Sequence, residues 1–115
     1  MLYRIEWYFE GTDEWFGMFR ENYLSKAVVR EMDKSIAMSD FNNNLPVVNS
    51  DGYDRGVENS CHCYFTAKGY KRFKESIHEW LRMLNKEVKV KVIRIKEDKY
   101  PKLFIDEYQA VLLDR

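Results

Sequence analysis

The chain opens with alternating apolar and polar residues, which predict a β-hairpin. Apolar side chains occupy every second position over residues 3–9, the period of a strand with one buried face. Residues 11–14 favour a turn, and residues 15–19 are apolar enough for a returning strand. The start of the chain is therefore expected to form two antiparallel strands.

From residue 23 the period changes, and it predicts a helix followed by a long loop. Apolar residues recur at spacings of three and four over residues 23–38, which indicates an amphipathic helix of about four turns. Residues 39–57 then contain a run of asparagines, a proline and two turn-forming Asp and Gly clusters. Because long connections are uncommon in compact domains and are often functional, we expect a central binding loop at about 39–57.

The second half predicts a strand, a helix and further strands. Residues 59–65 alternate, and Thr66 is placed to cap an amphipathic helix that ends near Asn85. Another strand is predicted over residues 87–96. For residues 103–113 the pattern favours a final strand, with a helix as the alternative.

The strand predicted over residues 87–96 has an irregularity in the middle. Its apolar positions change phase at Val92 and Ile93. Either the strand buries opposite faces at its two ends, or a bulge restores the register. We favour the bulge because it keeps one apolar side continuous.

The order of elements, ββα, loop, βαββ, predicts an α+β fold. Placing both helices on one face of a mostly antiparallel sheet buries both apolar stripes. The result is a small two-layer sandwich, with a ferredoxin-like arrangement as one candidate topology. A length of 115 residues is typical of a single domain, so we expect residues 1–115 to form one domain.

The composition favours a soluble globular protein. Hydrophobic residues make up 45% and charged residues 33% of the chain, which is unlike the composition of disordered proteins. The N-terminus lacks the pattern of a secretory signal, and no apolar run approaches the roughly 20 residues that cross a bilayer. We therefore predict a cytoplasmic protein that does not bind membranes.

Charge is divided along the chain. Residues 1–59 hold 11 acidic and 6 basic side chains, whereas residues 60–115 hold 8 acidic and 13 basic ones, so a net charge of zero conceals halves of −5 and +5. This division predicts surfaces of opposite sign for docking. Together with an exposed edge strand, it is also compatible with a homodimer.

Acidic and aromatic side chains of the first half are candidates for binding another protein. Carboxylates spaced along a surface can imitate phosphates and speed the encounter with a basic partner. Aromatic residues beside charges are typical of interface hot spots. The predicted partner-binding residues are Glu6, Tyr8, Glu10, Asp13, Glu14, Trp15, Phe41, Asp51, Tyr53 and Asp54.

Basic side chains of the second half are candidates for binding nucleic acid. With the bulge in place, the cations of residues 89–96 share one face, where they could follow a phosphate backbone while an aromatic ring stacks on bases. Lysines that protect an edge strand from aggregation are the alternative explanation. The predicted residues are Lys89, Lys91, Arg94, Lys96, Lys99, Tyr100 and Lys102.

Catalytic and metal-binding patterns are sparse. His62 and His78 are the two histidines, and neighbouring cysteines at 61 and 63 point away from His62 on a strand, so no Cys–His nucleophile pair is expected. The chain has no glycine-rich phosphate loop, nucleophile elbow or zinc-ligand spacing. We predict no enzymatic activity, no cofactor and no metal site.

These observations favour a non-catalytic protein-binding module that acts on another protein or nucleoprotein complex. By analogy with other small charged domains, we expect an inhibitor, such as an anti-CRISPR or other anti-defence protein of a mobile element, or an immunity protein. The alternative hypothesis is an accessory domain that binds nucleic acid through the basic strand.

Overall fold

The predicted hairpin is present as β1 (Leu2–Phe9) and β2 (Glu14–Gly17), two antiparallel strands. The computed structural model describes residues 1–21, 23–45 and 61–114. Alternation along β1 places Trp7 in the core, where it is fully buried. Its indole N–H donates a hydrogen bond of 3.1 Å to the carbonyl oxygen of Arg20, which ties the end of the hairpin to its own first strand.

The single helix predicted over residues 23–38 is two helices, α1 (Lys26–Asp33) and α2 (Ile36–Asn44). Ser35 separates them. Its hydroxyl donates to the carbonyl oxygen of Met32 at 2.6 Å and accepts from the backbone N–H of Met38 at 3.0 Å. The same side chain therefore ends one helix and caps the next, as serine does when it competes with the helical hydrogen-bond ladder.

The predicted loop at 39–57 is wrong over its first six residues, because residues 39–44 belong to α2. Two of the asparagines taken as turn formers bond back along the helix, Asn43 to Ser39 and Asn44 to Asp40. Phe41 faces the core at 4% exposure instead of lying in a loop. The rest of the predicted loop, from residue 46 onward, lies outside the described residues.

Strand β3 (Cys61–Thr66) leads into the second helical region, which is also divided, into α4 (Ala67–Arg72) and α5 (Lys74–Asn85). Thr66 caps α4 as predicted, since its hydroxyl accepts the backbone N–H three residues ahead at 3.0 Å. The chain bends at Phe73, which is 1% exposed. The bend turns this ring into the core.

Three strands complete the chain: β4 (Val90–Ile95), β5 (Lys102–Ile105) and β6 (Gln109–Leu113). The region 103–113 is extended, as favoured, but it forms a hairpin instead of one strand. Asp106 sets the turn, because its carboxylate accepts two backbone N–H groups at the start of β6, each at 2.8 Å. Asp side chains favour turns by this kind of local bond.

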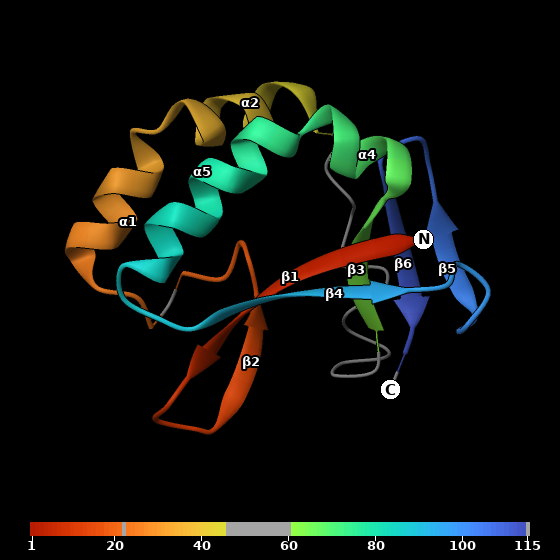
Figure 1. Ribbon diagram of the computed structural model, residues 1–115, viewed down its shortest axis with the longest axis horizontal. Coiled ribbons are helices and arrows are strands. Elements are labelled where there is room, and N and C mark those ends of the chain that lie inside the picture. Colours follow the sequence, from red (N-terminus) through yellow and green to blue (C-terminus); the bar gives the residue numbers. More distant parts are fainter. Residues whose placement is uncertain (22, 46–60, 115) are drawn as a thin grey trace.

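All strand pairs of the sheet are antiparallel. The order is β2-β1-β3-β6-β5, with β4 paired to the other edge of β1. On their shared edge, β2 pairs with residues 6–9 of β1 and β3 with residues 2–3, so the edge forks between them. The α+β class is confirmed, and the helices cover one face of the sheet (Figure 1). The ferredoxin-like order is not confirmed.

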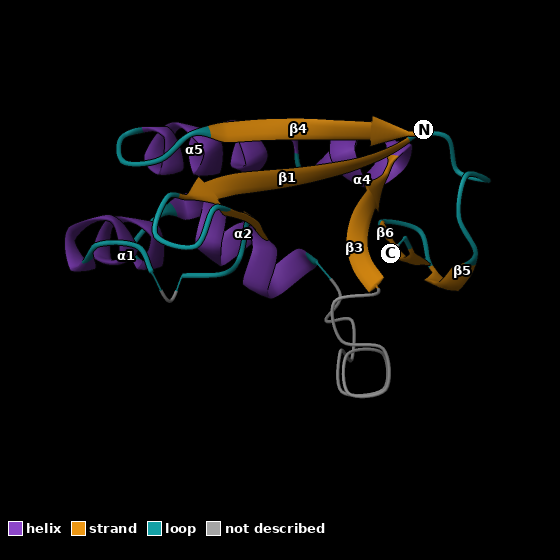
Figure 2. Ribbon diagram, turned by 90° about the horizontal axis from the view of Figure 1, so that it is seen from below, coloured by secondary structure: helices purple, strands orange, loops and turns teal. Residues whose placement is uncertain are grey.

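The sheet buries different faces at its two ends. Beneath the helices, Ile5, Trp7 and Phe65 join the main core with residues of α1, α2 and α5, and the partly buried Tyr70 of α4 packs against it. On the opposite face, a second cluster forms around Leu2 and Tyr64; its other buried members are Ile95, Ala110 and Leu112. This second cluster fits the curvature of the sheet, in which β3, β6 and β5 turn away from the plane of β1 and β4 (Figure 2).

Candidate functional site

Four side chains from β1, β2 and the β4 region meet on the sheet face that the helices do not cover. Tyr8 lies directly opposite Trp15, with ring centroids 5.3 Å apart. Nζ of Lys91 lies 3.9 Å from the centre of the Trp15 ring, and Nζ of Lys89 lies 5.9 Å from that of Tyr8. The negative faces of the rings attract both cations. We call these four residues the hairpin platform.

Asp13 fixes the tyrosine of the hairpin platform. The Tyr8 hydroxyl donates a hydrogen bond to the Asp13 carboxylate, and this bond, with slight burial and nearby negative charge, raises the pKa of Tyr8. Asp13 has φ of 56°, the left-handed conformation that Asp adopts more readily than most residues. The platform therefore presents two ammonium groups beside a fixed aromatic pair, with the carboxylate of Asp13 next to it.

The other residues of the predicted partner-binding set are dispersed. Glu10 and Glu14 are exposed near the hairpin turn. Glu6 and Phe41 were predicted to face a partner, but both are 4% exposed and lie inside the protein. Three members lie outside the described residues: Asp51, Tyr53 and Asp54.

The predicted row of cations on one face of β4 is wrong. The register between β1 and β4 runs without interruption from Trp7 opposite Val90 to Leu2 opposite Ile95, so there is no bulge. Lys91 therefore lies on the open face, which is the face of the sheet that the helices do not cover, and Arg94 points to the opposite face, the helix side. The apolar positions change phase because β4 contributes Val90 to the main core and Ile95 to the second cluster.

The remaining basic residues follow β4 in the chain and do not extend a row. Lys99 lies over the Tyr100 ring, 5.4 Å from its centre, and this ring packs against the second cluster. Lys102 forms an ion pair with Glu97 at 3.0 Å. Lys96, beyond the end of β4, is exposed.

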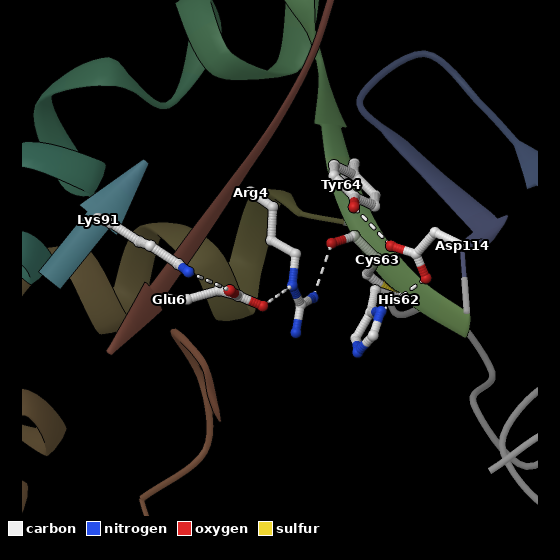
Figure 3. A network of polar contacts seen from close by, with 7 residues as sticks. All are labelled: Arg4, Glu6, His62, Cys63, Tyr64, Lys91 and Asp114. Carbon is white, nitrogen blue, oxygen red and sulfur yellow. Dashed lines mark hydrogen bonds and ion pairs between the residues drawn. The ribbon is translucent and has the colours of Figure 1, made fainter. Parts of the chain in front are cut away.

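A partly buried ionic network lies beside the platform (Figure 3). Arg4 Nε donates to the Glu6 carboxylate at 2.8 Å, and Lys91 Nζ lies 3.7 Å from the other oxygen of Glu6. A second nitrogen of Arg4 donates to the carbonyl oxygen of Cys63 at 3.0 Å. Because β2 and β3 part beside Arg4, this side chain bridges the fork from β1 to β3.

A second polar cluster joins β3 to the end of the described chain (Figure 3). Nδ1 of His62 lies 2.7 Å from one oxygen of Asp114, and the Tyr64 hydroxyl donates to the other at 2.5 Å. Burial opposes ionisation of Asp114, but the hydrogen bonds from both partners and the positive charge of His62 and Arg4 lower its pKa. Burial, followed by the bond to Asp114, raises the pKa of Tyr64.

The His62 cluster resembles part of a catalytic constellation, since a carboxylate orients an imidazole. Among the described residues, no three side chains of His, Cys, Asp or Glu converge as a metal-binding group. The neighbouring thiols at 61 and 63 fall on the opposite side of β3 from the imidazole by alternation. What the geometry shows is that the two bonds to Asp114 connect the end of β6 to β3.

We expect Tyr64→Phe to lower the free energy of unfolding by about 2 kcal/mol at neutral pH, because it removes a hydrogen bond to an ionised carboxylate. Since folding raises the pKa of Tyr64, this contribution is complete below about pH 10, the pKa of an unfolded tyrosine. It is lost as the pH rises through the folded-state pKa. Urea unfolding between pH 7 and pH 11 measures the difference.

Tyr23→Phe is the control for this measurement. Tyr23 is 50% exposed, so its replacement should change stability by less than about 0.5 kcal/mol. Equal curves of stability against pH for Tyr64→Phe and the natural protein would contradict the prediction.

Opposite charges of the two halves pair with each other inside the molecule. Glu31 contacts Lys86 at 2.8 Å and Arg82 at 3.6 Å, and Asp40 contacts Arg72 at 3.3 Å. Glu6 and Lys91 form a further pair of this kind. In each case the acid comes from residues 1–59 and the base from residues 60–115. Some of the opposite charges of the two halves therefore form ion pairs that join the halves within the molecule.

A cavity of about 480 Å³ opens beside the fork. Its lining includes Arg4 from β1, Phe19 beyond β2, Phe41 and Leu45 from the end of α2, and Cys63 from β3. Most of this wall is apolar, and Arg4 already bonds to Glu6 and to a backbone carbonyl. The cavity lies on the other side of β1 from β4, and sequence patterning gave no indication of it.

Comparison with models of known protein families finds no match. Searches of curated proteins and of solved structures likewise find none. None of the helices in the described part of the chain has the length and apolar character to span a bilayer.

Proposed function

We propose that this protein is a non-catalytic protein-binding module whose contact surface is the hairpin platform. The observation that supports this proposal is the fixed pair of Tyr8 and Trp15 rings on the open face of the sheet. Aromatic pairs that are already ordered lose little conformational entropy on binding. Their charged neighbours, Asp13, Lys89 and Lys91, give the mixed composition typical of interface hot spots.

The biological class that we propose is an inhibitor of another protein or complex, acting in the cytoplasm. Small domains that cover a partner without changing it chemically include anti-CRISPR and other anti-defence proteins and immunity proteins. This assignment is by analogy of size and surface, because folds host many functions.

We expect Trp15→Ala to weaken binding of the partner by at least about 30-fold, as loss of a central aromatic anchor does. The immobilised protein is incubated with host lysate, with and without nuclease, and retained proteins are identified by mass spectrometry. The affinity of the main nuclease-resistant partner is then measured for the natural protein and for the variant.

Lys74→Ala is the matched control, since Lys74 is exposed on α5 in the helical layer. It should retain the same partner with unchanged affinity. Equal retention by Trp15→Ala and Lys74→Ala would contradict the platform, provided that both variants keep the circular dichroism spectrum of the natural protein.

Nucleic-acid binding is the second candidate function, because Lys89 and Lys91 lie beside aromatic rings that could stack on bases. The carboxylate of Asp13 next to the Tyr8 ring opposes the approach of phosphates. Material that is retained only without nuclease, and released steeply as salt rises, would favour this function over protein binding.

A further inference from the structure

The outer edge of β4 is open in the described part of the chain. This strand pairs with β1 along one edge, and no described strand pairs with its other edge. Figure 2 shows β4 at the margin of the sheet. Val92, at its centre, is 39% exposed. An edge of this length presents backbone donors and acceptors that another chain can pair with.

The hydrogen-bond phase shows which residues of β4 face outward. The backbone N–H of Tyr8 donates to the carbonyl oxygen of Lys89 at 2.9 Å, so these two residues form a hydrogen-bonded pair. In an antiparallel ladder such pairs alternate, which makes residues 91, 93 and 95 the inward-bonded ones. Val90, Val92 and Arg94 therefore direct their N–H and C=O groups away from β1.

The side chains around this edge carry positive charge. Lys89 and Lys91 lie on the open face, Arg94 lies on the helix side, and Lys96 follows the strand. Of these four cations, only Lys91 forms an ion pair with a described residue, at 3.7 Å from Glu6. A strand that adds to this edge therefore meets unneutralised cations on both of its faces.

A second copy of the chain fits this edge poorly. Pairing of β4 with its own copy would place eight basic side chains along one seam, and β4 itself contributes no carboxylate. Like charges across a strand pair are destabilising. An extended segment with acidic side chains has the complementary charge.

We infer that the outer edge of β4 binds an extended acidic segment of a partner protein as an additional strand. Val90, Val92 and Arg94 supply the backbone hydrogen bonds. Acidic side chains of the segment lie on the open face, where Lys89 has no ion pair with a described residue, and apolar ones lie beside the valines on the helix side. This inference rests on the proposed function, because it names the chemistry of the protein partner.

The test uses a fluorescent ten-residue peptide in which glutamate and valine alternate. Val92→Pro removes the outward N–H of residue 92 and leaves the ladder with β1 complete, as proline does on an edge strand. Val92→Ala keeps this N–H and removes only a partly exposed side chain. We expect Val92→Pro to weaken peptide binding at least tenfold and Val92→Ala to change it less than threefold.

Hydrogen exchange of the unmodified protein provides a measurement that does not depend on the proline variant. The amides of Val90, Val92 and Arg94 should exchange fast in the free protein and slowly when the peptide is bound. Those of Lys91 and Ile93 are protected in both states. Equal peptide affinity for both Val92 variants, or unchanged exchange at the three outward amides, would overturn the inference.

Three further results would also overturn the inference. The first is equal affinity for a peptide in which lysine replaces glutamate. The second is displacement of the acidic peptide by an oligonucleotide whose own binding is unchanged by Val92→Pro. The third is a dimer in sedimentation that Val92→Pro dissociates. Failure here would leave the proposed function intact if Trp15→Ala still releases the captured partner. Conversely, peptide binding that depends on Val92 could persist if the platform fails its own test.

Discussion

Replacing Arg4 with methionine should lower the free energy of unfolding by about 3 kcal/mol, because it leaves the Glu6 carboxylate buried without its main partner. Glu6 is 4% exposed, and the Arg4 guanidinium is 2.8 Å from it. Lys91 remains at 3.7 Å with a side chain that is 41% exposed, so it compensates only in part. Urea unfolding at pH 7 measures the loss.

A double replacement separates the lost charge pair from lost packing. Arg4→Met combined with Glu6→Met removes both charges, and we expect it to recover most of the loss, since apolar residues of similar volume often replace buried ion pairs at little cost. Lys68→Met is the control. Lys68 pairs with Glu107 at the surface, where both side chains are more than half exposed, so its loss should cost less than about 0.5 kcal/mol. A cost for Arg4→Met as small as that of the control would contradict the prediction.

Features that depend on short stretches of chain could be predicted from the sequence. The β1–β2 hairpin follows from period-two alternation on both sides of a turn, and the cap at Thr66 follows from a hydroxyl residue before an amphipathic stripe. The pairing of Tyr8 with Trp15 is a direct consequence of that hairpin. The α+β class could be predicted because the apolar stripes of two amphipathic helices need a sheet to pack against.

The breaks within both predicted helices could not be read from periodicity. Apolar spacing continues through Ser35 and Phe73, so a window over either region indicates one helix. Ser35 ends the first helix by a side-chain bond whose strength competes with the ladder, and Phe73 bends the second because a fully buried ring is stabilising. Apolar periodicity records neither the local bond of Ser35 nor the burial of Phe73 in the core.

The polar part of the candidate site depends on register between distant strands, which local patterns do not encode. Glu6 belongs to a polar stripe of β1 and reads as exposed, but Arg4 and Lys91 enclose it after β3 and β4 have paired. No sequence pattern indicated a role for Asp114, because its partner His62 lies 52 residues earlier in the chain. One hint was present: Arg4 and Glu6 have opposite charges two residues apart, on one face of a strand.

The phase change in β4 is a second feature that depends on pairing between distant strands. Here the local pattern was visible in the sequence, but its structural cause was not. A bulge was favoured on the assumption that a strand buries one face along its whole length. The sheet instead buries the helix side near Val90 and the other side near Ile95. Residues from β1, β3, β4 and β6 form the second cluster, so its existence depends on all of those pairings at once.

Replacing Gly69 with alanine should also destabilise the protein by about 3 kcal/mol, although the same change in an exposed helix is stabilising by about 1 kcal/mol. A Cβ atom at this position would overlap the carbonyl oxygen of Tyr108 and would lie 2.8 Å from its Cα. That carbonyl also accepts the backbone N–H of Thr66 at 2.9 Å. Neither backbone segment can move without breaking the junction of α4 with the β5–β6 turn, and thermal unfolding measures the loss.

Gly17→Ala is the informative contrast, because the same atom is added against a different neighbour. The nearest atom to a Cβ there is the end of the Arg4 side chain, at 3.0 Å, and a side-chain tip can shift by a few tenths of an ångström. We expect a loss below about 1 kcal/mol at Gly17. A similar loss at both glycines would show that close approach of the backbone to Tyr108 is not what makes residue 69 a glycine. A large loss at Gly69 alone would place the cost at the contact with the backbone of Tyr108, the residue before β6.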